Sequence, residues 1–98
     1  MEINKNVNND ELTLNIIGRL DTTTAPELEA ELKSSLEGIK SLVLDLVDLD
    51  YISSAGLRVL LATQKIMNAQ GSMVIKNAKP EIMEVFEITG FSEFLKIV

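Results

Sequence analysis

Leu42-Val-Leu-Asp-Leu-Val-Asp-Leu-Asp-Tyr-Ile-Ser-Ser-Ala-Gly-Leu57 is the stretch that decides how this chain folds. Residues 42–47 form a nearly continuous apolar run, which predicts a strand buried on both faces inside a sheet. An acidic turn is expected at 48–50, and a helical pattern covers about 55–69 with Gly71 as its stop. A pair of hydroxyls therefore lies where a strand gives way to a helix, and the free amides of a helix N-terminus favour an anion there.

Strands and helices alternate on both sides of this stretch. Thr24 is expected to cap a helix, with Glu27 three residues further on as in a capping box. This alternation predicts an α/β fold in which helices pack against a central sheet. The expected elements are strands near Ile3, at 12–17, 42–47 and 72–76, helices at 24–38, 55–69 and 80–90, and a last helical turn or strand at 91–97.

Right-handed crossovers would place three loops on one edge of this sheet, after Leu20, after Val47 and after Asn77. Asp21 lies in the first of these loops and should therefore neighbour Ser54. Turn and capping chemistry accounts for the threonines of that loop, but it accounts less well for Asp21, because Thr24 already supplies the cap.

Composition excludes several classes of function. The 98 residues contain no cysteine and no histidine, which removes thiol nucleophiles, imidazole or thiolate metal sites and serine–histidine catalysis. A net charge of −6 with two arginines argues against nucleic acid as a partner. No segment has the length of a membrane span, and the amino terminus lacks the apolar segment of a signal peptide. We expect one domain over 1–98 that is soluble and cytoplasmic.

The two serines are expected to have different roles. Serine is a preferred N-cap residue, and one hydroxyl is enough to cap the helix, so we assign Ser53 to capping and leave Ser54 free. Ala55 and Gly56 would leave the backbone open to close approach by another molecule. Glycine in a first helical turn costs up to about 1 kcal/mol relative to alanine, so Gly56 should have a packing or access reason.

Two other chemistries are weaker candidates. Ser54 has no histidine base, and Leu57 stands where a serine hydrolase of the lysine type would need its lysine. Asp45, Asp48 and Asp50 could bind magnesium or accept phosphate as in receiver domains. The segment at 8–10 is a poor match for the acid pair of such a site, so we favour a solvated turn for these acids.

Four motifs together resemble a known family. They are Gly18-Arg-Leu-Asp21 with Thr24-Ala25, Leu42-Val-Leu-Asp-Leu46, Tyr51-Ile-Ser-Ser-Ala-Gly-Leu57 and Ile88-Thr-Gly-Phe91. In this order and spacing, over essentially all 98 residues, the chain resembles a stand-alone STAS domain of the bacterial anti-sigma factor antagonist type. The resemblance implies a small STAS-type α/β domain with a central mixed sheet of four to five strands and helices packed against it.

The family motif at the start of the second helix is Asp-Ser-Ser/Thr-Gly-Leu, with its first hydroxyl residue as phosphoacceptor. In this chain Ser53 stands in the place of the aspartate, Ser54 in that of the phosphoacceptor and Ala55 in that of the second hydroxyl, whereas Gly56 and Leu57 match. A nearby carboxylate, Asp50, could replace the missing aspartate, and Asp21 matches an acidic position near the family's partner surface.

The resemblance implies partner switching in transcription regulation. The unphosphorylated protein would bind a GHKL-type serine kinase that is also an anti-sigma factor, and a sigma factor would be released. Phosphorylation of Ser54 would end this binding, and a PP2C-type phosphatase would restore it. The protein itself would be no enzyme and would need neither cofactor nor metal. The implied partner-binding residues are Asp21, Thr24, Asp50, Ser53, Ser54, Ala55, Gly56, Leu57 and Arg58.

Three alternatives stay open at this point. A STAS domain could be an unphosphorylated subunit of a transport or other signalling complex, which the missing aspartate favours. A receiver-like phosphoacceptor would use Asp48 or Asp50. Nucleotides or lipids have been proposed as ligands of related domains, but no residue of this chain supports them specifically.

Overall fold

A turn at Asn9 and Asp10 folds the first two strands into a hairpin. In the computed structural model, which describes residues 1–98, β1 (Glu2–Asn8) runs antiparallel to β2 (Glu11–Leu20). Asn9 has φ 58°, a left-handed conformation that asparagine tolerates better than most residues. Both strands are longer than predicted, and the buried positions of β2 follow the expected period of two.

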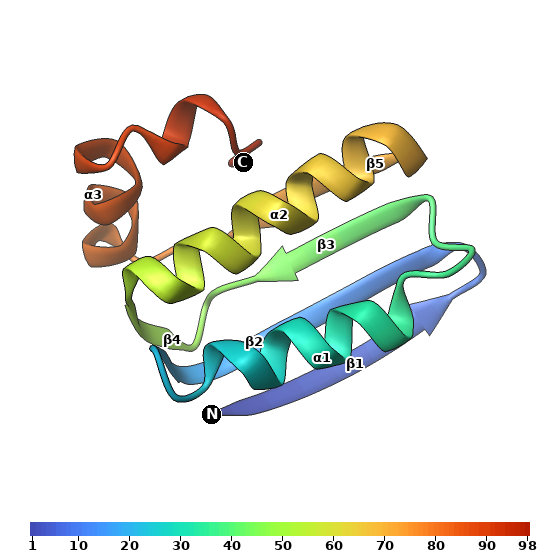
Figure 1. Cartoon of the computed structure of the whole chain (residues 1–98), viewed down its shortest axis with the longest axis horizontal. Helices are drawn as coiled ribbons and strands as arrows, with labels where there is room; N and C mark the ends of the chain where they lie inside the picture. Colours follow the sequence, from blue (N-terminus) through green and yellow to red (C-terminus); the bar gives the residue numbers. More distant parts are fainter.

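β2 is the central strand of the sheet, because it pairs with three others. Its first half is parallel to β3 (Ser41–Asp45), and its last residues are parallel to the short strand β4 (Leu49–Ile52). β5 (Ser72–Lys76) is parallel to β3 on the far side. The order β1-β2-β3-β5, with β4 beside β2, is a mixed five-stranded sheet, which confirms the predicted fold class (Figure 1).

β4 was not predicted from the sequence, and the acidic turn predicted at 48–50 was wrong in part, because Leu49 and Asp50 belong to this strand. Leu49 and Ile52 are buried, whereas Asp50 and Tyr51 point outward between them. Four residues with a buried–exposed–exposed–buried pattern show neither the helical nor the strand period, so the segment gave no periodic signal.

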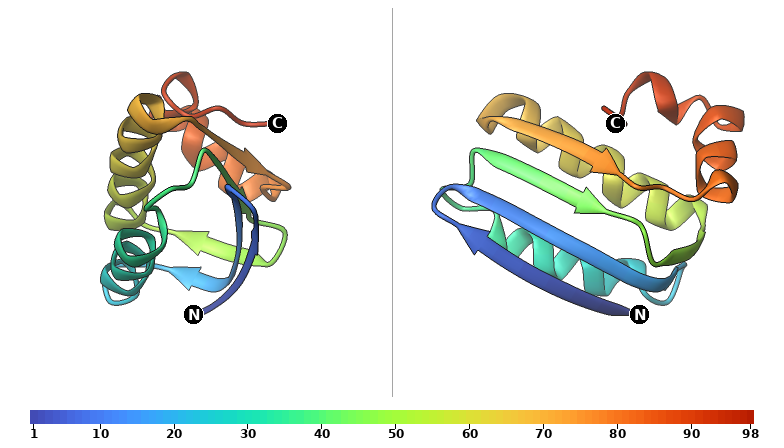
Figure 2. Two further views of the ribbon diagram at one scale, coloured as in Figure 1. Left: turned by 90° about the vertical axis from the view of Figure 1, so that its right-hand side faces the viewer. Right: turned by 180° about the vertical axis from the view of Figure 1, so that it is seen from behind.

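Three helices follow the strands. α1 (Ala25–Ser35) and α2 (Ser54–Gln70) lie on the same face of the sheet, whereas α3 (Pro80–Ile88) packs against β4 at one end (Figure 2). α1 ends three residues earlier than predicted, at a cap on Leu36, although Leu36 itself is buried as expected. α2 ends at Gly71 because the backbone of Lys40 crosses there: a Cβ on Gly71 would lie 2.0 Å from that carbonyl oxygen.

The last apolar segment contains both alternatives that the sequence left open. Phe91–Glu93 forms the short 3₁₀ helix η1, and Ile97 then makes a parallel bridge to Ile75 at the free edge of β5.

Only one face of the sheet is buried. Side chains on that face pack under α1 and α2, and the alternate side chains of β2, β3 and β5 stay partly accessible. The prediction that 42–47 is buried on both faces was therefore wrong. Val43 is only half-buried on the uncovered face, and Val47 is 46% exposed in the turn after β3. The fully buried strand positions are Leu12, Leu14, Ile16, Leu20, Leu42, Leu44, Leu49 and Ile75.

The starts of all three helices gather at one edge of the sheet, where β2, β4 and β5 end (Figure 1). The loops after Leu20 and after Asn77 reach this edge as predicted. After Val47 the chain makes only a short turn before β4, and Ser53 alone separates β4 from the second helix. None of the helices is long and apolar enough to span a bilayer.

Candidate functional site

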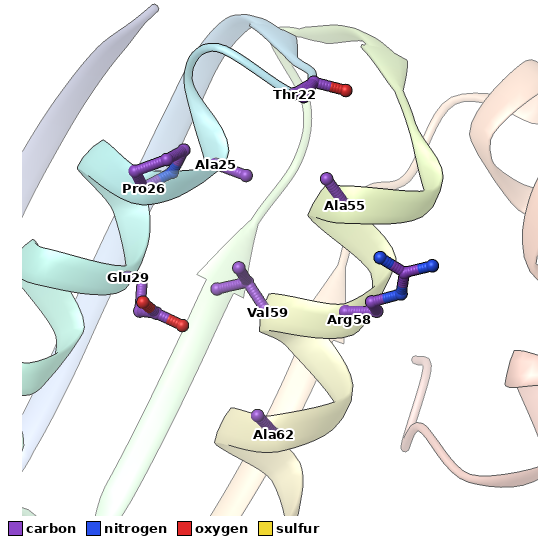
Figure 3. A pocket seen from close by; sticks show the side chains of 8 residues that line it. All are labelled: Thr22, Ala25, Pro26, Glu29, Ala55, Arg58, Val59 and Ala62. Carbon is purple, nitrogen blue, oxygen red and sulfur yellow. The ribbon is translucent and has the colours of Figure 1, made fainter.

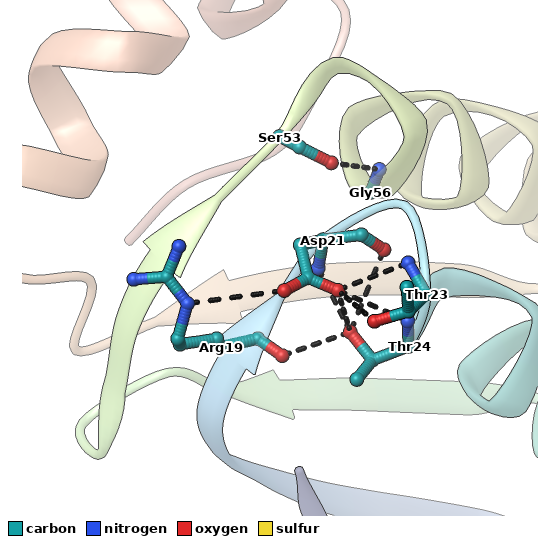
Figure 4. Close-up of polar contacts among 6 residues, drawn as sticks. All are labelled: Arg19, Asp21, Thr23, Thr24, Ser53 and Gly56. Atoms are coloured by element: carbon teal, nitrogen blue, oxygen red, sulfur yellow. Dashed lines mark hydrogen bonds and ion pairs between the residues drawn. The ribbon is translucent and has the colours of Figure 1, made fainter.

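Ser53, at the start of α2, has the capping role that was predicted from the sequence. Ser53 is the N-cap residue in an extended conformation, and its Oγ accepts a hydrogen bond from the Gly56 amide at 3.4 Å (Figure 4). Ser54 is the first helical residue and is exposed. Because Ser53 already serves as the cap, the Ser54 hydroxyl faces solvent without an intramolecular hydrogen bond.

The loop before α1 is closed by the carboxylate of Asp21. Its Oδ1 accepts hydrogen bonds from the amides of Thr23 at 3.0 Å and Thr24 at 3.1 Å, and from the Thr23 hydroxyl at 2.8 Å (Figure 4). These donors, the Thr23 hydroxyl first, hold the pKa of Asp21 below its ordinary value of 3.8, although partial desolvation opposes the shift.

Thr24 does not cap α1, so the capping box predicted for Thr24 and Glu27 was wrong. The Thr24 hydroxyl donates to the Arg19 carbonyl at 2.8 Å and accepts from the Asp21 amide at 2.8 Å, and no side chain caps the first turn of α1. Asp21, which the capping prediction had left unexplained, is the residue that binds the free amides of this loop.

Arg19 connects the ends of β2 and β4. It lies opposite Tyr51 in the sheet, with its guanidinium carbon 4.2 Å from the centroid of the Tyr51 ring and its Nε 3.8 Å from Asp21 Oδ2. This contact was not predicted, because it depends on the register of β4 against β2. An exposed aromatic residue two positions before the serine pair was the available signal.

Asp45 and Asp50 have different hydrogen-bond partners. Asp50 pairs with Lys79, the residue before α3, and this hydrogen bond is the main cause of a raised pKa for Lys79. Asp45 Oδ1 instead accepts from the Val47 amide and from Asn77, both at 3.1 Å. No three acidic side chains are grouped so that they could hold a metal ion, which weighs against the receiver-like alternative.

Gly56 and Leu57 face the core. A Cβ on Gly56 would lie 2.7 Å from Leu20 Cγ and 3.0 Å from Ile52 Cγ1, and Leu57 is buried. The small residue at position 56 therefore has a packing reason, and the interpretation that it opens the backbone to another molecule was wrong. Any binding contribution of these two residues would be indirect, through the path of the loop above them.

A groove begins beside Ser54, between the first turns of α1 and α2. It has a volume of about 380 Å³ and a floor of small apolar side chains such as Ala25, Ala55 and Ala62 (Figure 3). Glu29 lines it on the α1 side and Arg58 on the α2 side. A second, smaller depression continues between the same helices toward Ile66, which is 48% exposed.

The structure thus brings the predicted residues to one edge of the sheet but not to one surface. Ser54, Asp50 and Arg58 are exposed, and Ala55 lines the groove. The side chains of Asp21, Thr24 and Ser53 are half-buried and already engaged in hydrogen bonds.

This arrangement is a small α/β domain with a capped, solvent-exposed serine at the start of its second helix, and comparison with known proteins agrees. The STAS domain family model matches residues 2–98, so the chain belongs to the STAS domain family.

Two relatives and one solved structure of the same fold illustrate the similarity. The protein BtrV of Bordetella bronchiseptica, whose full name is "Putative anti-sigma factor antagonist BtrV", is 49% identical over 76 residues. These residues are 76% of this chain and 66% of BtrV. The anti-sigma-B factor antagonist of Bacillus subtilis is 33% identical over 100 residues, covering 99% of this chain and 92% of its own length. The structure of the Bacillus anti-sigma factor antagonist SpoIIAA in its unphosphorylated form matches with a TM-score of 0.84 and 16% identity over 99% of this chain and 88% of that one.

Proposed function

We propose that this protein is an anti-sigma factor antagonist: it binds a GHKL-type serine kinase that acts as anti-sigma factor, and phosphorylation of Ser54 ends that binding. The observation that carries the proposal is the state of Ser54, which is exposed and unengaged at the start of α2 because Ser53 serves as the cap. The names of the relatives at 49% and 33% identity support the same role.

The chemistry of the switch belongs to the partners. The kinase would transfer the γ-phosphoryl group of ATP to Ser54 Oγ, the hydroxyl proton would pass to a base of the kinase, and ADP would leave. A PP2C-type phosphatase would hydrolyse the ester to serine and phosphate. This chain has no histidine and acts as binding partner and substrate. Because sigma factors act in the bacterial cytoplasm, the proposed function also places the protein there.

The physical effect of the phosphate should fall on the interface rather than on the fold. A phosphate adds nearly two negative charges, and a helix N-terminus stabilises such a charge by about 0.3–1 kcal/mol. Burying the new anion against a partner surface that fits a neutral serine would cost several kcal/mol. Each 1.4 kcal/mol is about tenfold in affinity, so a modified chain would dissociate.

Intact mass spectrometry after incubation with the cognate kinase and ATP tests the proposal. We expect one phosphoryl group on the wild-type chain and none on Ser54→Ala. Thr22→Ala is the matched control, since Thr22 is a second exposed hydroxyl at the same edge without a hydrogen bond, and it should be phosphorylated as wild type. Phosphate on Thr22, or an acid-labile acyl phosphate, would contradict the assignment.

A second test separates binding from folding. Ser54→Asp should bind the kinase at least about tenfold more weakly than wild type, while its thermal midpoint stays nearly unchanged. Isothermal titration and a thermal melt on the same preparation measure both quantities. Unaltered affinity, or loss of the folded state, would count against this account.

One observation favours a second candidate, an unphosphorylated STAS subunit of another complex. Ser53 replaces the family aspartate, and Asp50, which could have replaced it, is paired with Lys79 instead. If the kinase binds this chain but never modifies it, that candidate is the better description.

A further inference from the structure

Arg58 lies four residues after Ser54 on α2, so the two side chains share one face of the helix. Residues with this spacing have Cβ atoms about 5–6 Å apart. The Arg58 side chain extends back toward the first turn of α2, the direction that helical side chains favour (Figure 3). Its guanidinium can therefore reach a group on Ser54 without any movement of the backbone.

Two other cations near this edge already have partners. Arg19 lies over the ring of Tyr51 and beside Asp21, and Lys79 pairs with Asp50. Arg58 is exposed and makes no ion pair, hydrogen bond or contact with an aromatic ring. It is thus a free positive charge one helical turn from the proposed phosphoacceptor.

We propose that a phosphate on Ser54 captures Arg58, so that one modification adds a negative charge to this surface and removes the free positive charge beside it. This inference rests on the proposed phosphorylation of Ser54. A guanidinium presents paired donors whose spacing matches two phosphate oxygens, which an ammonium group does not. The order is also the favourable one, because the anion lies on the N-terminal side of the cation.

Capture of Arg58 changes the groove as well as the serine. Arg58 lines the mouth of the groove between α1 and α2, next to Ala55. In the unphosphorylated protein its guanidinium is available to an acidic side chain of the partner. Once the phosphate binds the Arg58 guanidinium, this contact with the partner is lost. The loss weakens binding further, beyond the repulsion that the phosphate itself causes.

The test uses the full chain with phosphoserine placed at position 54 during translation, so that no kinase is needed. A ³¹P NMR titration gives the second pKa of the phosphate, which is about 6 for free phosphoserine. We expect the pKa to lie below this value in the wild-type background and to rise by roughly 0.3 of a pH unit or more in Arg58→Ala. Arg58→Lys should recover part of the shift, because it keeps the charge but not the paired donors.

Lys65→Ala is the matched control, since it removes one exposed cation from the same helix. Lys65 is eleven residues from Ser54, about 16 Å along the axis, beyond the reach of unscreened attraction in physiological salt. The phosphate pKa should be unchanged in this variant. An equal rise in both variants, or no rise in Arg58→Ala, would overturn the proposal.

A second readout shows the arginine directly. The Nε–H resonance of Arg58 should move when serine 54 is replaced by phosphoserine, whereas that of Arg19 should stay in place. Because the phosphate is installed without the kinase, a chain that no kinase modifies would defeat the proposed function and leave this result standing. If a kinase phosphorylates Ser54 but the Arg58 resonance does not move, the proposed function stands and the capture of Arg58 is refuted.

Discussion

The starts of α1 and α2 have similar sequences and positions, but their hydroxyl groups are hydrogen-bonded differently. Both helices begin just after a strand at the same edge of the sheet, in a stretch rich in hydroxyls. Before α1, one carboxylate, Asp21, accepts hydrogen bonds from two amides and a threonine hydroxyl. Before α2, Ser53 accepts a single long hydrogen bond, and Ser54 is left exposed.

The difference shows what makes a hydroxyl available for modification. A threonine that completes the hydrogen bonding of a turn is part of the fold, and attaching a phosphate to it would break that turn. Ser54 contributes nothing to the turn before it, so its hydroxyl can be modified while the helix start survives. Substitutions at both helix starts test this contrast, and they are given in order of expected effect.

Gly56→Val should have the largest effect. The added side chain would enter the space occupied by Leu20 and Ile52, and overpacking of this kind costs about 1–3 kcal/mol. Ala55→Val is the matched control, because Ala55 is only partly buried and lines the open groove. Urea denaturation measures both variants, and equal stabilities would mean that α2 is not fixed to the sheet at Gly56.

Asp21→Ala should lower the melting temperature by about 4–8 °C, because the turn before α1 loses the carboxylate that accepts several of its hydrogen bonds. The change leaves the Thr23 amide without its acceptor, and the Thr24 amide keeps only the Asp21 carbonyl at 3.2 Å. Ser53→Ala removes one weaker bond and should cost about 0.5–1 kcal/mol, toward the low end of capping effects. A larger loss for Ser53 than for Asp21 would reverse the comparison.

The pH dependence of stability should report Asp21 separately. Its pKa in the folded chain lies below the ordinary 3.8, so its stabilising effect is complete above 3.8 and is lost as the pH falls through the lower folded value. Asp21→Asn should therefore lose less melting temperature than wild type between about pH 5 and pH 2. Asp10→Asn is the matched control, because it removes an exposed carboxylate whose side chain makes no hydrogen bond.

Ser54→Ala should have the smallest effect, within about 0.5 kcal/mol of wild type, as expected for an exposed residue without contacts. Chemical denaturation alongside Ser53→Ala gives the most direct comparison of the two neighbouring serines. A clear loss of stability in Ser54→Ala would mean that this hydroxyl is structural after all.

Most of the fold follows from periodic segments in the sequence. The alternation at 12–17, the apolar run at 42–47 and the helical pattern at 55–69 located β2, β3 and α2. β4 was missed because four residues are too few for a period, and its pairing with the end of β2 depends on tertiary packing.

The parts of the site that could be predicted from the sequence are those formed by neighbouring residues. Ser53 was predicted as the cap because serine is a preferred N-cap residue and one hydroxyl of the pair is enough. Before α1, the spacing of Thr24 and Glu27 predicted a capping box, and no spacing showed that Asp21 accepts from the loop amides instead. The pair between Asp50 and Lys79 joins residues 29 apart in sequence, for which no local pattern exists.

The three-way pairing of β2 has a consequence for how the protein opens. A strand held by β1, β3 and β4 should be the last to release its amide protons to exchange, since its hydrogen bonds break only when several neighbours separate together. Leu20, at its end, lies beneath Gly56, so the start of α2 rests on this slow-exchanging strand. The hairpin partner β1 and the C-terminal residues can fray and re-form many times while Ser54 is presented in one fixed place.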